Sequence, residues 1–326
     1  MKRVFKPAIP SAAVKMVILM GIAVLLSQCN LRELLYSKSR QRALQADYIS
    51  YMNGALADNL KGRQDGYIRV MRTLANIMAD YENMPAGERR GRYDYMLSAA
   101  LNSEPEIAAL YTVWKPNAVD GMDSRHIGRP GSGPSGQYAA SFTKDDDQAR
   151  METVAHTDIE TAMIYLNGSD SKKDFVEDPV PGQLNGRDTY LIRMSVPIVN
   201  RRTNETTGIV GCLLSIDPVQ TFLEQAIMDN SEVAAMAVYS NNGFIMGSYV
   251  PDRIGKNISE VDTIYGDYIK EAEQAVHRGM NFSCLSYSSV LRTNISIFMT
   301  SIRIGNSDTT WTVMIAATEE YLKRMY

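Results

Sequence analysis

The sequence predicts an α+β protein in which a long N-terminal helix carries two antiparallel-sheet domains and is preceded by a transmembrane helix. Three observations lead to this prediction: an uncharged apolar run near the N-terminus, a helical pattern that continues after it, and two successive groups of short strands separated by turns. A length of 326 residues suits two domains. We expect a cytoplasmic N-terminus, an anchor, a spine helix, a larger membrane-distal domain and a smaller membrane-proximal one, at residues 1–10, 11–31, 32–85, 86–226 and 227–326.

The N-terminal segment has the charge order of a membrane anchor. Lys2, Arg3 and Lys6 precede an apolar run at residues 16–26 that carries no charge. A span needs about 20 residues, which is reached if it covers residues 11–31 with Lys15 at the cytoplasmic interface. The positive flank places the N-terminus inside and the rest outside. A cleaved signal peptide and a lipid anchor at Cys29 are the alternatives. The unbroken helical pattern that follows favours an uncleaved anchor.

Residues 31–81 form the predicted spine. Apolar side chains such as Leu44, Tyr48 and Met52 recur at spacings of three or four, as on one face of a helix. A single helix of this length would extend about 75 Å at about 1.5 Å per residue, which is typical of a spine or a dimer seam. Three glycines could kink it, and two separate helices packed on a core are the alternative.

The larger sheet domain follows a short helix at residues 89–102. Strands are predicted from β-branched and aromatic content at 107–114, 137–143, 188–199 and 207–216. Between them lie a Gly-, Pro- and Ser-rich loop at 115–136, a helix at 145–163 and a polar loop at 167–186. This order implies an antiparallel sheet with helices on one side.

The smaller domain repeats the pattern after a connecting helix at residues 217–226. Strands are predicted at 234–239 and 244–248, joined by the tight turn of Asn241, Asn242 and Gly243. A helix at 262–278 and three strands at 281–287, 294–304 and 310–317 complete it. The chain therefore has two unequal sheet domains on one long helix.

Composition and motifs exclude several functions. The net charge is −3, from 34 basic and 37 acidic residues, so nucleic-acid binding has no electrostatic support. Three histidines and three cysteines lie far apart without metal-ligand spacing, so we expect neither a metal site nor another cofactor. The sequence has no Gly-x-Ser-x-Gly and no histidine with an obvious serine or cysteine neighbour. We therefore expect no enzyme and no catalytic residues, with a membrane-anchored hydrolase as the rival.

Several stretches resemble one family of sensors. They are TVWKPNAVDGMDS at residues 112–124, the Gly128-Arg129 pair, SVPIVN with GIVGCLLSI in the last distal strands, and VYSNNGFIMGSYVPDRIGKNISEV at 238–261. Their order resembles the double-Cache sensor region of bacterial methyl-accepting chemotaxis proteins and related sensor kinases. The two sheet domains would then be PAS-like Cache domains in the periplasm, anchored in the inner membrane.

The resemblance implies a function and partners. A small molecule would bind in the distal domain, and the signal would pass down the helix of a homodimer. A second span, a HAMP linker and a cytoplasmic signalling hairpin are also implied. Contacts with a kinase and a coupling protein would need those C-terminal parts, which do not follow Tyr326 in this sequence. The alternatives are a ligand-independent dimerisation module, a module that contacts a binding protein, or the sensor of a histidine kinase or cyclase.

Candidate ligand contacts combine aromatic walls with fixed polar groups, as pockets for polar metabolites do. An Arg fork can grip a carboxylate or phosphate at two points. Tyr111 and Trp114 are three residues apart on one strand, so they face opposite sides and one of them is core or surface. The predicted site residues are Tyr111, Trp114, Arg129, Tyr138, Ser141, Asp174, Asp178, Tyr190 and Arg193.

The ligand class stays open at this stage. The amino-acid-binding subgroup of the family carries an Arg-x-Trp-Tyr motif after the first strand, whereas this sequence reads GRPGSGPSGQY there. The subgroup also has an Asp in the last distal strand that grips the ligand amine, and Leu213 lies near that position. A free α-amino acid is therefore not favoured, and purines, organic acids, amines and sugars remain.

Overall fold

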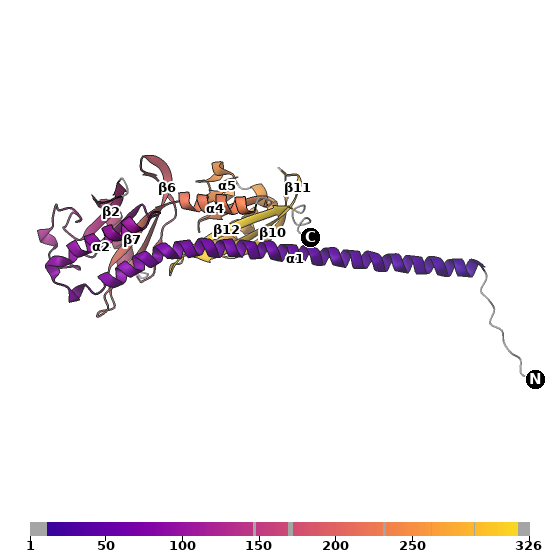
Figure 1. Cartoon of the computed structure of the whole chain (residues 1–326), viewed down its shortest axis with the longest axis horizontal. Helices are drawn as coiled ribbons and strands as arrows, with labels where there is room; N and C mark the ends of the chain where they lie inside the picture. Colours follow the sequence, from indigo (N-terminus) through magenta and orange to yellow (C-terminus); the bar gives the residue numbers. More distant parts are fainter. Residues whose placement is uncertain are drawn as a thin grey trace, which may run out of the picture.

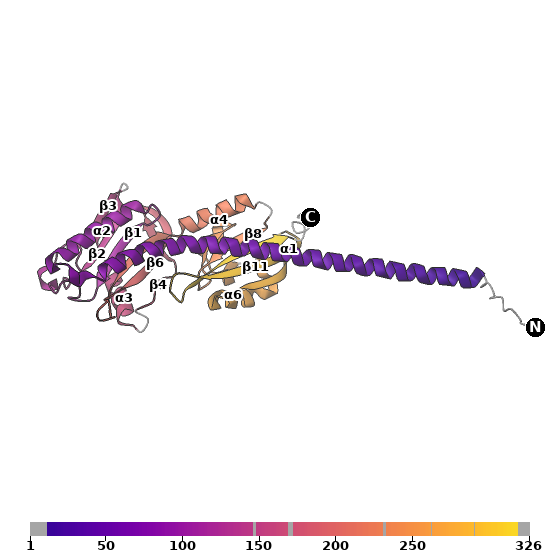
Figure 2. The same cartoon turned by 60° about the horizontal axis from the view of Figure 1, so that its bottom comes forward.

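A computed structural model describes residues 12–145, 148–168, 172–230, 233–261, 263–289 and 291–318. Its first element, α1 (Ala12–Met78), is one continuous helix of 67 residues, about 100 Å long at about 1.5 Å per residue. The single spine is therefore confirmed. Figures 1 and 2 show α1 running alongside both sheet domains and projecting beyond the smaller one.

The segment after α1 reverses the chain at the distal end. Two short 3₁₀ helices, η1 (Tyr81–Asn83) and η2 (Ala86–Glu88), lead into α2 (Arg89–Ser103). Pro85 disfavours helical geometry at Met84, whose backbone is extended (φ −120°, ψ 142°). The helix ends at Met78 rather than at residue 85, and Pro85 prevents helical geometry from passing Met84.

The larger domain is one antiparallel sheet with the strand order β3-β2-β1-β7-β6-β4, with β5 also pairing with β6. Its strands are β1 (Ala109–Trp114), β2 (Ala139–Asp145), β3 (Gln148–Thr153), β4 (Phe175–Val176), β5 (Val180–Leu184), β6 (Arg187–Val199) and β7 (Thr206–Ser215). The short η3 (Asp123–Arg125) lies in the loop between β1 and β2.

Three predictions for this domain were wrong. The segment expected as a polar loop at residues 167–186 contains strands β4 and β5, which pair with β6. The helix expected at residues 145–163 is strand β3 followed by α3 (His156–Asn167). Strand β3 pairs with β2 in a hairpin, and this tertiary pairing overrides the helical pattern of its acidic start. Helices also lie on both faces of the sheet, since α1 and α2 contact one face and α3 packs on the other, against β7.

The smaller domain is a five-stranded antiparallel sheet with the order β10-β11-β12-β8-β9. Its strands are β8 (Ala235–Tyr239), β9 (Ile245–Ser248), β10 (Phe282–Ser288), β11 (Thr293–Arg303) and β12 (Thr310–Thr318). Helix α4 (Asp217–Asp229) leads into it, and η4 (Pro251–Arg253), α5 (Ile258–Val261), η5 (Thr263–Tyr268) and α6 (Ile269–Arg278) follow β9.

One hydrophobic core joins α1 to both sheets. Alternate residues of the strands pack against α1 and its neighbours α2 and α4, while the opposite face of the smaller sheet packs on η5 and α6. Asn53 of α1 fixes the helix to the smaller sheet, because its Nδ2 donates to the carbonyl oxygens of Phe298 and Val313, each at 3.1 Å.

Among the residues that the structure describes, no helix has a stretch long and apolar enough to cross a membrane. The anchor predicted at residues 11–31 and the cytoplasmic segment 1–10 stay predictions. Residues 1–11 lie outside the described ranges.

Candidate functional site

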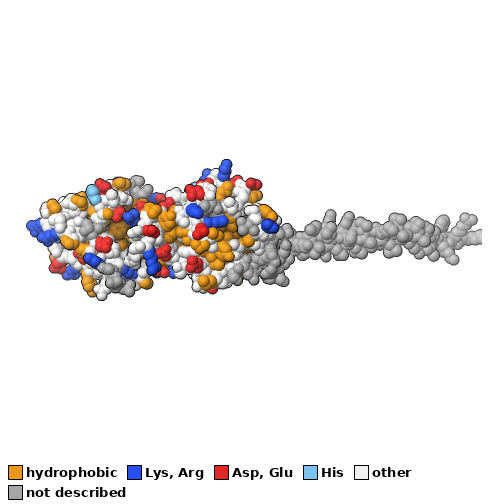
Figure 3. Space-filling model, turned by 90° about the horizontal axis from the view of Figure 1, so that it is seen from above, with side chains coloured by type: hydrophobic (Ala, Val, Ile, Leu, Met, Phe, Trp, Pro, Cys, Tyr) orange, Lys and Arg blue, Asp and Glu red, His pale blue; other side chains and the backbone are white. Residues whose placement is uncertain are grey.

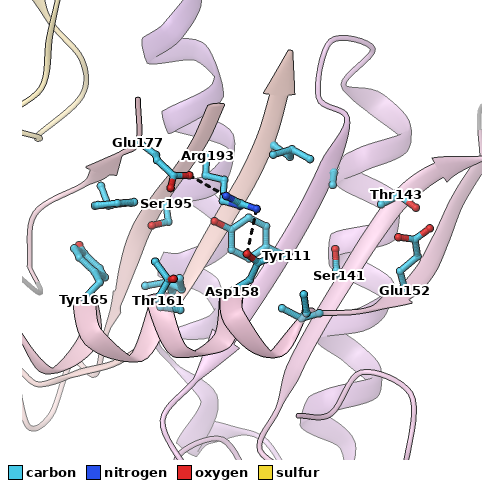
Figure 4. Close-up of a pocket in the computed structure, with 17 residues that line it drawn as sticks. Tyr111, Ser141, Thr143, Glu152, Asp158, Thr161, Tyr165, Glu177, Arg193 and Ser195 are labelled. Atoms are coloured by element: carbon cyan, nitrogen blue, oxygen red, sulfur yellow. Dashed lines mark hydrogen bonds and ion pairs between the residues drawn. The ribbon is translucent and has the colours of Figure 1, made fainter. Parts of the chain in front are cut away.

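A cavity of about 290 Å³ lies between the larger sheet and α3 (Figure 4). Its volume is near the lower end of ligand pockets, about 300 to 1,000 Å³. The register of the sheet explains its lining, because residues directly opposite one another on neighbouring strands share a face.

The first lining row crosses the whole sheet. Tyr111 of β1 lies opposite Ser141 of β2, which lies opposite Glu152 of β3. On its other side the row continues through Gly211, Ser195 and Phe175. The edge strands β3 and β4 thus bring Glu152 and Phe175 to opposite ends of the row.

The second row lies two residues further along each strand. It consists of Thr143, Ala109, Leu213 and Arg193, and Glu177 completes it through the hydrogen bond of its backbone N–H to the Arg193 carbonyl at 2.9 Å. Leu213 lines the cavity, so an apolar side chain occupies the place near which the amino-acid-binding subgroup carries an acid.

Helix α3 closes the cavity from the other side. Asp158, Thr161 and Tyr165 project from successive turns of the helix toward the sheet, as Figure 4 shows. The buried Ile159 and Leu166 hold α3 on the sheet through a small cluster with Val113 and Ile209. Spacings of three and four place these residues on one helix face.

Arg193 joins three elements at the centre of the cavity. Its guanidinium lies 3.0 Å from Glu177, the residue after β4, and 3.1 Å from Asp158 on α3. Burial alone would lower the pKa of Arg193, but the hydrogen bond to Glu177 and the charges of both carboxylates outweigh burial and raise it. Arg193 of β6 is therefore a fixed cation that links β6 to α3 and to the residue after β4.

Tyr111 forms the floor of the cavity because Gly211 lies opposite it. A Cβ at position 211 would lie 2.2 Å from Cζ of Tyr111, so only glycine lets the ring lie across β7. Burial raises the pKa of the Tyr111 hydroxyl, which therefore stays protonated at neutral pH.

An aromatic pair closes one end of the cavity. The rings of Tyr165 and Phe175 lie 5.6 Å apart, tilted by 49°. The Tyr165 hydroxyl donates to the Lys173 carbonyl, which links α3 to the segment before β4. Together with Tyr111 these rings give the cavity an apolar surface between its charged groups.

Of the nine predicted site residues, the structure brings Tyr111, Ser141 and Arg193 to this cavity. Trp114 and Tyr138 lie on the face of the sheet opposite the cavity. For Trp114 this follows from its position three residues after Tyr111 on the same strand. Trp114 is 0% exposed and stacks on Tyr93 of α2 with ring centroids 5.9 Å apart. The Tyr138 hydroxyl donates to Asp94 of α2 at 2.7 Å. Both side chains belong to the core against α2.

Arg129 is exposed in the loop between β1 and β2, away from the cavity. The same loop is fixed to α2 by the buried Arg90. The guanidinium of Arg90 binds Asp120 at 2.7 Å and Asp123 at 2.6 Å. The loop therefore packs against the end of the molecule that carries α2.

Asp174, Asp178 and Tyr190 lie at the junction of the two sheet domains. Asp174 forms an ion pair with Arg72 of α1 and accepts the backbone N–H of Asn306 at 2.7 Å. Asp178 accepts a hydrogen bond from Asn242. Tyr190 packs edge-to-face on Phe244, with centroids 4.8 Å apart.

The residues around β4 alternate between the cavity and the junction. Phe175 and Glu177 line the cavity. The residues between and beside them contact the smaller domain, since Asp174 binds Asn306 and the Val176 carbonyl accepts from Thr309 Oγ1 at 3.2 Å. One short segment therefore touches the cavity on one side and both α1 and the smaller domain on the other.

Sequence reasoning missed Glu152, Asp158, Glu177 and Ser195. Glu152 and Asp158 lie in the segment predicted as one helix, and Glu177 in the segment predicted as a loop. Ser195 is two residues from Arg193 on the same strand, so strand periodicity alone indicates that they share a face.

Comparisons with known proteins bear on the fold. No family model matches the chain. Over 178 residues the chain is 22% identical to the methyl-accepting chemotaxis protein TlpQ of Pseudomonas aeruginosa, a match that covers 50% of this chain and 25% of that protein. The matched part is therefore only a quarter of the length of that relative.

Two solved structures are similar over most of the chain. The extracellular domain of mmHK1S-Z2, described as a histidine kinase, is 19% identical with a TM-score of 0.67, covering 86% of this chain and 99% of that one. The ligand-binding domain of the Pseudomonas fluorescens chemoreceptor CtaA, in complex with L-isoleucine, is 15% identical with a TM-score of 0.57, covering 89% and 99%. The chain has the fold of a chemoreceptor or histidine-kinase sensor domain. The predicted resemblance is thereby confirmed.

Proposed function

We propose that the chain is the extracytoplasmic sensing region of a bacterial signalling receptor and has no catalytic activity of its own. A small molecule occupies the cavity between the larger sheet and α3, and its binding is transmitted through β4 to α1 and the smaller domain. Residues after about 31 lie in the periplasm, and residues 11–31 anchor the chain in the inner membrane.

The alternation around β4 is the observation that carries this proposal. A ligand that contacts Phe175 or Glu177 changes the position of the same segment whose other side binds Arg72 and the turn at residues 304–309. Gly305 in that turn allows the close approach, because a Cβ there would lie 2.6 Å from Oδ2 of Asp174. If this segment has two positions, a ligand shifts the equilibrium between them only by the difference in its affinity for the two.

Helix α1 also supplies a surface for a second copy of the chain. Leu44, Tyr48 and Tyr51 are 49%, 45% and 76% exposed, and their spacing places them on one stripe. A parallel pair of α1 helices would bury this stripe and would carry a displacement of about one or two ångströms toward the membrane.

A cavity-filling variant tests the proposal. The full chain in mild detergent is screened against a metabolite library by thermal shift, in which a ligand at 100 times its Kd adds about 2.7 kcal/mol. Ser141→Phe fills the cavity at its centre, and the exposed Ser124→Phe is the matched control. We expect compounds that stabilise the wild type and Ser124→Phe but not Ser141→Phe. Equal stabilisation of all three proteins would overturn the proposed site.

A further inference from the structure

We infer that the ligand of this cavity is a small organic cation whose ammonium group binds Glu152. The inference rests on the proposed function and extends it to the chemical class of the ligand. Three features of the lining support the inference. They are its negative charge balance, two polar side chains without a partner (the Glu152 carboxylate and the Ser195 hydroxyl), and its aromatic surface.

The charge balance of the lining is negative. Three carboxylates, Glu152, Asp158 and Glu177, face one guanidinium, Arg193, which leaves a formal charge of −2. The protein as a whole carries only −3, and acidic and basic side chains are interspersed over the face in Figure 3. The cavity therefore attracts cations locally.

Arg193 does not offer a site for an anion. Its two terminal nitrogens already lie 3.1 Å from Asp158 and 3.0 Å from Glu177. A carboxylate ligand would have to displace one of them and leave a protein carboxylate unpaired in a partly buried place. The guanidinium is thus already paired with both of the carboxylates that lie beside it.

Glu152 is the carboxylate that remains. It is an exposed residue of the edge strand β3 that lines the cavity directly opposite Ser141, and within the described ranges its side chain has no ion-pair partner. Figure 4 places it away from Arg193. An ammonium group carries three donors and no acceptor, so Glu152 and the neighbouring hydroxyls of Ser141 and Thr143 can accept from it.

Ser195 gives a second, independent indication of a ligand. It is 2% exposed and lines the cavity, yet its hydroxyl has no hydrogen-bond partner in the described part of the chain. The side chain lines the cavity, so a polar ligand atom can form a hydrogen bond with this hydroxyl. The rings of Tyr111, Tyr165 and Phe175 add surfaces that attract a cation.

Size-matched probes test the inference on the full chain. 2-Phenylethylamine, 2-phenylethanol and phenylacetate differ in the charge of one end, and L-phenylalanine carries both charges. Affinities are measured by titration calorimetry at neutral pH. We expect the amine to bind several-fold more tightly than the other three, because an ion pair with an exposed carboxylate contributes up to about 1 kcal/mol.

Two glutamate variants locate the charge. Glu152→Gln should weaken amine binding several-fold and leave 2-phenylethanol unchanged, whereas Glu160→Gln, which alters a likewise exposed glutamate on α3 outside the cavity, should change neither. The inference is overturned if the amine fails to bind, if phenylacetate or L-phenylalanine binds as tightly, or if Glu152→Gln has no effect. Amine binding that survives Ser141→Phe overturns the proposed function itself.

Discussion

Asp174 connects the cavity segment to α1 and to the smaller domain, so its removal is a direct perturbation of the junction. Its side chain is 0% exposed and accepts from Arg72 and from the backbone of Asn306. Each hydrogen bond to a charged group contributes about 1.5 to 3 kcal/mol. Arg72 is 35% exposed and can turn to water, so the low end applies. Asp174→Ala should lower the free energy of unfolding by about 3 kcal/mol.

The two tryptophans make the assay specific for each domain. Trp114 lies in the core of the larger domain and Trp311 in β12 of the smaller one. Urea unfolding followed by fluorescence in Trp311→Phe and Trp114→Phe backgrounds reports each domain separately. Because each background substitution itself changes stability, each transition is compared with that of its own Asp174 parent, and we expect Asp174→Ala to lower the two by unequal amounts. A loss below about 1 kcal/mol, no larger than that of the exposed control Asp252→Ala, would refute the role of the junction.

Three further predictions concern the site and the core. Gly211→Val should displace the Tyr111 ring into the cavity, which should abolish ligand binding and cost about 1 to 3 kcal/mol of stability by thermal and urea unfolding; retained affinity would contradict the role of Gly211. Trp114→Phe should lower stability by about 1 to 2 kcal/mol but leave ligand affinity within about twofold by calorimetry, because Trp114 packs against α2 and its Nε1 has no hydrogen-bond partner to lose. Burial would raise the pKa of Asp120, but the hydrogen bond from Arg90 outweighs burial and holds this pKa below its usual value. This stabilisation is present above the unfolded pKa of about 3.9 and is lost as the pH falls further, so Asp120→Asn should flatten the acid limb of stability against pH measured by urea unfolding; an unchanged slope would contradict this.

The long helix, both antiparallel sheets and most strand positions could be predicted from the sequence, because period-two and helical patterns are local signals. Strand β3 could not. Residues 148–153 begin beside an acidic run that suggests a helix start, and only pairing with β2 makes them a strand. A local pattern carries no information about that partner.

The site was predictable only where one strand decides it. The period-two rule separates Tyr111 from Trp114, and the same rule separates Tyr190 from Arg193, which are also three residues apart and in fact face different surroundings. The convergence of Glu152, Asp158 and Glu177 depends on the register of six strands and on the position of α3. Neither follows from a single sequence.

Hydrogen exchange of the full chain tests whether ligand binding in the cavity is transmitted to the smaller domain. A compound that stabilises the wild type but not Ser141→Phe is added at saturation, and backbone amide exchange is compared with and without it. Transmission through β4 predicts changed protection at residues 173–178 and also at the turn 304–309 of the smaller domain, which the ligand does not touch. Changes confined to the cavity strands and α3, with the turn unaffected, would contradict transmission through β4.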